Sequence, residues 1–230
     1  MADKKILAVV GATGAQGGGL VRAILGDKTS GFTARALTRD VNSEKAKTLA
    51  KLGAEVVAAN LDDPASLARA FSGAYGAFCV TNFWEHFSPE KELAQAKALA
   101  QAAKQTGLQH VIWSTLEDTR RWVPLSDARM PTLMGHYKVP HFDAKGEADQ
   151  EFTALGVPTT FYLTSYYWEN LSSSAWDPRR ARTGPWRSRC PWATKNFRAW
   201  PSTISEHARS GFSRKGVNTS ARPSAWPAST

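Results

Sequence analysis

The chain has 230 residues, a formal net charge of +9 at pH 7 and only two cysteines. This length suffices for one well-buried core and at most a second small domain. No apolar run is long enough to span a membrane, and the charged first residues continue directly into a strand pattern, so we expect no secretory signal and a cytoplasmic protein. Cys79 and Cys190 lack the spacing of metal ligands, so we predict a reduced thiol at Cys79 and no metal site.

The positive charge is confined to the last quarter of the chain. Residues 174–230 contain nine Arg and two Lys against Asp177 and Glu206, so residues 1–173 are neutral overall. The same segment holds five of the nine Trp and six of the twelve Pro, and it shows neither helical nor strand periodicity. We therefore divide the chain into a folded domain over 1–173 and an irregular basic tail over 174–230.

Two explanations of this tail stay open. A basic segment with tryptophans could stack on single-stranded nucleic acid, although its aromatic residues have no regular spacing. We favour a shift of reading frame, because back-translating residues 191–200 from one base earlier can encode P-M-G-D-K-E-L-P-G-M, a plausible soluble sequence. On this hypothesis nucleic acid is not a partner of the protein.

The first predicted element is a strand that breaks into a glycine-rich turn. Apolar residues 7–10 precede a helix expected from about 15 to 27, and the turn between them is Gly11-Ala12-Thr13-Gly14-Ala15-Gln16-Gly17. Glycines let the backbone turn sharply and approach a ligand, and the first amides of the following helix face that turn. The pattern predicts a pyrophosphate site of the dinucleotide-binding kind, with an ordinary glycine-rich loop as the alternative.

Beyond this turn, strand and helix patterns alternate along the folded domain. We expect strands at 5–10, 32–38, 54–58, 75–81, 109–114 and 159–163, and helices near 15–27, 43–52, 64–72, 88–106 and 143–156. Such alternation predicts an α/β fold of the Rossmann type, a doubly wound parallel sheet with helices on both faces. Ligands of such sheets bind at the carboxyl ends of the strands.

The tip of the second strand selects between nicotinamide cofactors. It ends in Thr38-Arg39-Asp40, at the place where a carboxylate would favour the ribose 2′-hydroxyl of NAD. A guanidinium can instead pair with a 2′-phosphate through two parallel hydrogen bonds, so Arg39 predicts NADP. The alternative is a solvated surface arginine with Asp40 as its neighbour.

Polar residues also follow the third and fourth strands. Asn60-Leu61-Asp62-Asp63 is placed to border the adenine, and Thr81-Asn82-Phe83-Trp84 is placed over the inner ribose and nicotinamide. Asn and Asp also close turns and cap helices without any ligand, so turn chemistry is an equal alternative at both places.

Four segments together resemble the NmrA-like family, whose members are atypical short-chain dehydrogenases/reductases. These segments are A-V-V-G-A-T-G-A-Q-G-G at 8–18, V-T-N-F-W-E at 80–85, H-F-D-A-K-G-E at 141–147 and Y-W-E-N at 167–170. The resemblance covers residues 1 to about 173, and P-M-G-D of the shifted frame is also similar to the family's next segment.

The resemblance implies a cofactor site for NADP(H). The residues that it assigns to this site are Gly11, Ala12, Thr13, Gly14, Ala15, Gln16, Gly17, Arg39, Asn60, Leu61, Thr81, Asn82, Phe83, Lys145, Tyr167, Trp168, Glu169 and Asn170. One family lysine after the fourth strand aligns with Ala94, so one charged contact to the cofactor is missing.

The usual proton donor of a short-chain reductase is missing as well. Such enzymes have a Tyr four residues before a Lys, which lowers the pKa of the tyrosine so that it can pass a proton to the substrate. Here His141 holds the tyrosine position before Lys145, and Ser114 or Thr115 could polarise a substrate carbonyl. Lys145, Ser114 and His141 are therefore the candidate catalytic residues.

Other side chains offer little replacement for that donor. Tyr137 and Tyr167 are the tyrosines that could compensate for the missing phenol. His136 and His141 have no further Cys or acidic partners at ligand spacing, so we interpret them as loop and helix-start residues and not as metal ligands.

Two functions remain. The resemblance implies a regulator that binds NADP(H), senses the redox state, and has a transcription factor or a signalling protein as its partner or forms a homodimer. The alternative is an NADPH-dependent oxidoreductase that acts on a quinone or a related carbonyl.

Overall fold

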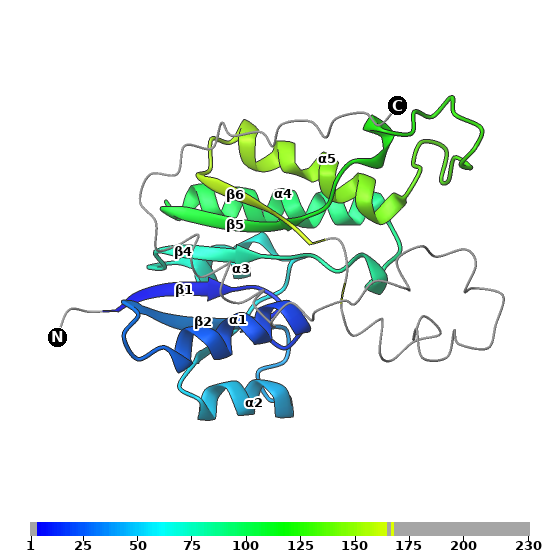
Figure 1. The fold of residues 1–230 in the computed structure, drawn as a ribbon. Helices are drawn as coiled ribbons and strands as arrows, with labels where there is room; N and C mark the ends of the chain where they lie inside the picture. Colours follow the sequence, from blue (N-terminus) through cyan, green and yellow to red (C-terminus); the bar gives the residue numbers. More distant parts are fainter. Residues whose placement is uncertain (1–3, 165–166, 168–230) are drawn as a thin grey trace, which may run out of the picture.

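The computed structural model describes residues 4–164 and 167, and its centre is a six-stranded sheet (Figure 1). The order of strands across the sheet is β3-β2-β1-β4-β5-β6, and every neighbouring pair is parallel. In this order the winding of the chain reverses between β1 and β4, which is where doubly wound proteins bind their ligands. The strands are β1 (Lys5–Val9), β2 (Phe32–Thr38), β3 (Glu55–Ala58), β4 (Gly76–Cys79), β5 (His110–Thr115) and β6 (Thr159–Leu163).

Helices cover both faces of the sheet, which confirms the predicted α/β fold. On one face, Leu20 and Ile24 of α1 share a buried cluster with Phe78 of β4. On the other face, α3, α4 and α5 bury their apolar sides against Trp113 of β5. The helices are α1 (Ala15–Gly26), α2 (Glu44–Lys51), α3 (Pro64–Phe71), α4 (Pro89–Gln105) and α5 (Pro140–Ala154), with short 3-10 helices η1 (Phe83–Glu85) and η2 (Thr119–Arg121).

Two glycines of the turn between β1 and α1 cannot be replaced without strain. Gly11 has φ +63°, a backbone conformation that side chains disfavour. A Cβ atom on Gly17 would lie 2.4 Å from the carbonyl oxygen of Gly11. The missing side chains therefore let the start of α1 approach the end of β1 closely.

The fifth helix begins earlier than the sequence pattern predicts. The expected range starts at 143, whereas α5 begins at Pro140, because proline is favoured in the first turn of a helix. The buried Asp143 carboxylate fixes this start by accepting hydrogen bonds from the backbone N–H of Lys138 at 2.7 Å and of Val139 at 3.0 Å. His141 consequently lies within α5, one turn before Lys145.

Some predictions fall on residues that the structure does not describe. The basic tail at 174–230, the domain limit at 173 and the predicted cofactor residues Trp168, Glu169 and Asn170 belong here. Within 4–164 and at 167, none of the helices is long and apolar enough to cross a membrane, and no cluster of three His, Cys, Asp or Glu could hold a metal ion. Cys79 is buried in β4 as a free thiol, and burial raises its pKa.

Candidate functional site

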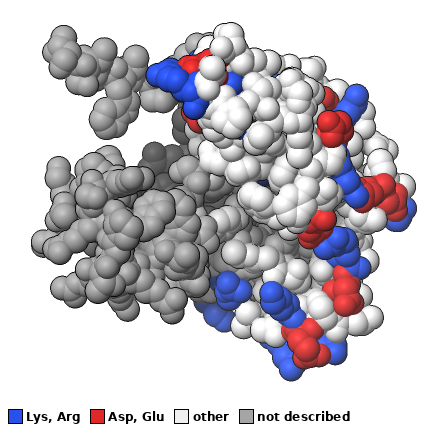
Figure 2. All heavy atoms as spheres, turned by 90° about the vertical axis from the view of Figure 1, so that its right-hand side faces the viewer, with Lys and Arg blue, Asp and Glu red and all other residues white. Residues whose placement is uncertain are grey.

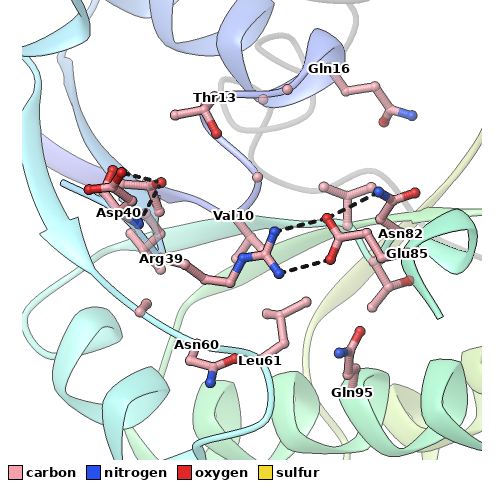
Figure 3. A pocket seen from close by; sticks show the side chains of 18 of the residues that line it. Val10, Thr13, Gln16, Arg39, Asp40, Asn60, Leu61, Asn82, Glu85 and Gln95 are labelled. Carbon is pink, nitrogen blue, oxygen red and sulfur yellow. Dashed lines mark hydrogen bonds and ion pairs between the residues drawn. The ribbon is translucent and has the colours of Figure 1, made fainter. Parts of the chain in front are cut away.

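A cavity of about 660 Å³ lies at the carboxyl ends of β1, β2, β3 and β4 (Figure 3). This volume lies within the range of about 300–1,000 Å³ that cofactor sites typically have. Predicted cofactor residues from five segments line it: Gly11, Thr13, Gly14, Ala15, Gln16, Gly17, Arg39, Asn60, Leu61, Thr81, Asn82 and Tyr167. Asp62, from the segment placed to border the adenine, also lines it, as do residues without a predicted role, including Val10, Glu85, His86, Lys91 and Gln95.

Five predicted residues do not line this cavity. Ala12 and Phe83 are buried, Phe83 among the aromatic rings that follow β4. The three candidate catalytic residues Ser114, His141 and Lys145 are not lining residues, and each is engaged with other side chains.

The start of α1 presents backbone donors to the cavity. Gly14 caps this helix without a side-chain hydrogen bond, and the first-turn amides of Ala15, Gln16 and Gly17 have no acceptor within the described part of the chain. Free amides at a helix N-terminus, together with the helix dipole, bind phosphate groups. This arrangement fits a pyrophosphate in the position that the sequence predicts.

The partner of Arg39 is Glu85 and not Asp40. The Arg39 guanidinium makes two parallel contacts, from Nη1 to Oε2 and from Nη2 to Oε1 of Glu85, both 2.9 Å long (Figure 3). Asn82 donates a further hydrogen bond of 3.3 Å to the same carboxylate. The Asp40 carboxylate instead accepts the backbone N–H of Asn42 at 2.8 Å.

The residues after β3 combine turn chemistry with a place in the cavity wall. The side-chain oxygen of Asn60 accepts the backbone N–H of Asp62 at 3.1 Å, which closes the turn. Asp62 accepts a hydrogen bond of 2.8 Å from Gln95 and pairs with Lys91 at 3.0 Å. The Gln95 hydrogen bond, assisted by Lys91, lowers the pKa of Asp62, so an anion stands at this end of the cavity.

A buried polar network holds Lys145. Its ammonium donates to the Thr81 hydroxyl at 2.7 Å and pairs with Glu92 of α4 at 2.9 Å. The Thr81 hydroxyl in turn donates to the same Glu92 oxygen, and Glu92 is fully buried. Burial lowers the pKa of Lys145, and the Glu92 carboxylate opposes that change. Thr81 is the member of this group that also lines the cavity.

His86 extends this network toward the cavity. Its Nδ1 accepts the backbone N–H of Ser88 at 3.1 Å, so in the neutral ring the proton lies on Nε2. That Nε2 lies 3.4 Å from the second carboxylate oxygen of Glu92, and both atoms are buried without a hydrogen bond in the described structure.

Gln16 connects the glycine turn with the far side of the cavity. Its amide donates to the Tyr167 hydroxyl at 2.8 Å, and its carbonyl oxygen accepts from the Ser114 hydroxyl at 2.8 Å. The Ser114 hydroxyl is therefore occupied inside the fold, while Tyr167 stands at the cavity wall.

His141 packs against an aromatic cluster. Its ring centroid lies 4.7 Å from that of Trp84 and 5.8 Å from that of Phe83. Burial lowers the pKa of His141, so the imidazole is neutral at neutral pH. Tyr137 is buried beneath the Arg120 guanidinium, 5.3 Å from its ring centroid, and is not a lining residue of the cavity.

Glu85 and Glu92 were not predicted from the sequence. Glu85 lies inside the segment 80–85 that carries the family resemblance, but only the residues before it were assigned a role. Glu92 resembles a solvent-facing acid of the first helical turn, yet it is in helical register with Ala96, Leu99 and Ala103 of the buried face. That register is the signal that could have identified it.

The charges around the strand ends are mixed. Figure 2 shows the side toward which the strands of Figure 1 point, and Lys and Arg alternate there with Asp and Glu over the described residues. The described part presents no broad basic surface on this side. A polyanion such as nucleic acid would need one.

Comparisons with known proteins identify the family. Residues 3–195 match the model of the NmrA-like family. The chain belongs to this family. An NmrA-like family domain-containing oxidoreductase of Malbranchea aurantiaca, malD, is 37% identical over 185 residues, which are 76% of this chain and 54% of that protein. The chain thus spans about half the length of malD, and its matches cover 34% and 33% of two further NmrA-like oxidoreductases, notA' of Aspergillus versicolor and FrzB of Cladobotryum sp.

Solved structures show the same fold. The negative transcriptional regulator NmrA in complex with NADP is 29% identical with a TM-score of 0.56, over 69% of this chain and 44% of that one, and NmrA has also been solved with NAD. The NADPH-dependent quinone oxidoreductase of Escherichia coli, complexed with NADPH, is 22% identical with a TM-score of 0.58, over 76% of this chain and 54% of that one. The NADP of the NmrA complex agrees with the predicted cofactor.

Proposed function

We propose that this NmrA-like chain binds NADP(H) in the cavity at the strand ends and acts as a regulator that senses the redox state of the cofactor. The single observation that carries the regulatory part is the state of His141 and Lys145. The residue in the proton-donor position is a neutral imidazole packed on Trp84, and the neighbouring lysine is paired with a buried carboxylate.

The residues around the cavity suit the parts of such a cofactor. The free amides of the first turn of α1 would bind the pyrophosphate, and Arg39 would bind the 2′-phosphate. Asn60 and Leu61 would border the adenine, while Thr81 would lie toward the nicotinamide ribose with Lys145 behind it. When bound, NADPH supplies a hydride at its nicotinamide ring.

The chain's own groups give little acid catalysis for such a transfer. A short-chain reductase donates a proton from a tyrosine whose pKa a free lysine lowers. Here Glu92 offsets the charge of Lys145, and the His141 ring is neutral. A protein that binds the cofactor but lacks an effective proton donor is suited to sense whether NADP or NADPH is bound. Sensing requires two conformations of the protein that differ in their affinity for the cofactor.

The first test is cofactor binding followed by thermal unfolding. A ligand that binds only the folded protein at about one hundred times its Kd stabilises it by about 2.7 kcal/mol. Arg39→Glu should weaken NADPH binding more than NADH binding, because only NADPH carries the 2′-phosphate. Equal losses of affinity for NADPH and NADH would contradict the assignment of Arg39 to the 2′-phosphate.

The second test is turnover. Tight NADPH binding without NADPH oxidation across a panel of quinones and other carbonyl acceptors supports the sensor. NADPH oxidation that is lost in Lys145→Ala would contradict it and establish the alternative, an oxidoreductase acting on a quinone or related carbonyl.

One observation favours that alternative. Trp84 of η1 is exposed and packs on His141, the exposed Phe87 packs on Trp84, and a flat aromatic acceptor would stack against these rings. The relative malD is named an oxidoreductase, and a structural neighbour is a quinone oxidoreductase.

The protein partner, the homodimer and the cytoplasmic location also remain proposals, and size-exclusion chromatography with and without NADPH tests the dimer.

A further inference from the structure

The ion pair between Arg39 and Glu85 spans the cofactor cavity. Arg39 follows β2 and Glu85 ends η1 after β4, while β1 lies between these two strands in the sheet. The pair therefore crosses over the end of β1, beside the glycine turn (Figure 3). This is the switch point of the sheet, across which a dinucleotide lies in doubly wound proteins.

The same carboxylate engages two residues that the family resemblance assigns to the cofactor. It accepts two hydrogen bonds of 2.9 Å from Arg39 and one of 3.3 Å from Asn82. A carboxylate and a phosphate monoester offer a guanidinium the same arrangement of paired oxygens. Glu85 thus occupies Arg39 in the manner expected of the 2′-phosphate.

From this geometry we infer that Arg39 and Glu85 form a latch that closes the cavity and must open when a nicotinamide dinucleotide binds. The latch rests on the proposed function, because it requires the dinucleotide to occupy this cavity. Opening separates the end of β2 from η1, the element that carries the exposed Trp84. Cofactor binding thereby changes the contacts of η1, as a sensor requires.

If the latch exists, replacing Arg39 should change the binding affinities for NADH and NADPH in opposite directions. NADH must break the pair and offers Arg39 no new anion, so removing either partner should strengthen NADH binding. NADPH also breaks the pair but gives Arg39 its 2′-phosphate, so loss of Arg39 should weaken NADPH. An arginine that only binds the phosphate would leave NADH binding unchanged.

The expected size follows from the exposure of the pair. The side chains of Arg39 and Glu85 are 67% and 46% exposed, and exposed ion pairs change an equilibrium by at most about fivefold. Glu85→Gln and Arg39→Gln should each lower the Kd of NADH about three- to fivefold. Glu85→Gln should lower the Kd of NADPH at least as much, because a negative charge beside the 2′-phosphate is also removed.

The experiment is a fluorescence titration of both cofactors into the full chain and its variants. The double variant Arg39→Gln/Glu85→Gln should bind NADH no more tightly than either single variant, because each opens the same latch. Glu55→Gln is the matched control, since Glu55 of β3 forms an ion pair of 2.8 Å with Arg35 of β2 and neither residue lines the cavity. It should leave both Kd values unchanged. The gains should also shrink at about 1 M salt, where the Debye length is about 3 Å.

The possible outcomes separate the latch from the proposed function. If wild type binds NADPH but Glu85→Gln binds neither cofactor more tightly, the latch is contradicted and the cofactor site stands. Gains for NADH that add in the double variant, or that Glu55→Gln reproduces, also contradict the latch. If none of these folded proteins binds either cofactor, the proposed function fails and the latch fails with it.

Discussion

The two halves of the strand-end region differ in how their polar groups are satisfied. On the side of β1, β2 and β3, amides at the start of α1 have no acceptor within the described residues, and Arg39 is largely exposed. On the side of β4, β5 and α5, Lys145, Glu92 and Thr81 are buried and are partners of one another. The first half therefore leaves backbone donors without a partner among the described residues, whereas the polar groups of the second half are partners of one another. We refer to them as the open and the closed half.

This difference has a physical cause. Exposed polar groups exchange protein partners for water or a ligand at little cost, so the first half can stay open. Buried charges lose their hydration and must be paired within the fold. The ion pair with Glu92 therefore compensates the buried charge of Lys145. The same ion pair holds the ammonium in place and leaves it less able to assist proton transfer.

The largest expected effect comes from breaking the closed half. Glu92→Leu leaves the Lys145 ammonium buried without its carboxylate, which should lower the free energy of unfolding by about 3–5 kcal/mol. Urea denaturation measures this loss. The matched variant Glu92→Leu/Lys145→Met removes both charges and should recover most of the stability, and a double variant as unstable as Glu92→Leu would show that the ion pair is not the cause.

A smaller effect is expected from a methyl group in the open half. The Cβ of Gly17→Ala would lie 2.4 Å from the Gly11 carbonyl oxygen, so the start of α1 must shift, at a cost of about 1–3 kcal/mol. NADPH binding should be lost as the amides move.

Gly19→Ala is the control for that change, since a Cβ there meets nothing within 4 Å. It should raise the free energy of unfolding by up to about 1 kcal/mol through helix propensity and leave NADPH binding intact. Both variants are compared by thermal unfolding and NADPH titration, and equal behaviour would contradict the packing argument.

The smallest expected effect is a pH dependence in the closed half. Asp149 of α5 accepts hydrogen bonds from Trp113 at 2.9 Å and from Thr115 at 2.6 Å, and burial raises its pKa from the usual 3.8 to about 6. Between these pH values the folded protein binds more protons than the unfolded chain, so the contribution of Asp149 to stability falls as the pH rises.

Asp149→Asn removes this titration while keeping an oxygen to accept both hydrogen bonds. Above pH 6 it should therefore be more stable than wild type, by about 1 kcal/mol after allowance for partial exposure. Denaturation curves at pH 4 and pH 7 measure the free energies of unfolding of wild type and variant. If the variant is more stable than wild type by the same amount at both pH values, the pKa of Asp149 is not raised.

Much of the fold could be predicted because its signals are local. The alternation of strand and helix and the glycine turn each depend on neighbours in the chain, and the observed order of elements confirms the alternation. The start of α5 was missed although its causes are also local, namely Pro140 in the first turn and the hydrogen bonds of Asp143 to the backbone of Lys138 and Val139. The contact of Asp143 with Thr119, 24 residues earlier, is one that no local pattern predicts.

The sequence by itself determined the family, the Rossmann-type fold and the position of the glycine turn. The turn is visible in the sequence because the backbone at Gly11 and Gly17 leaves no room for a side chain without strain. Only the tertiary structure decided which charges meet. Glu85 lies 46 residues from Arg39 and pairs with it because β2 and β4 both flank β1. Glu92 meets Lys145 because α4 and α5 cover the same face of the sheet, where low solvent access forces charges to find partners within the fold.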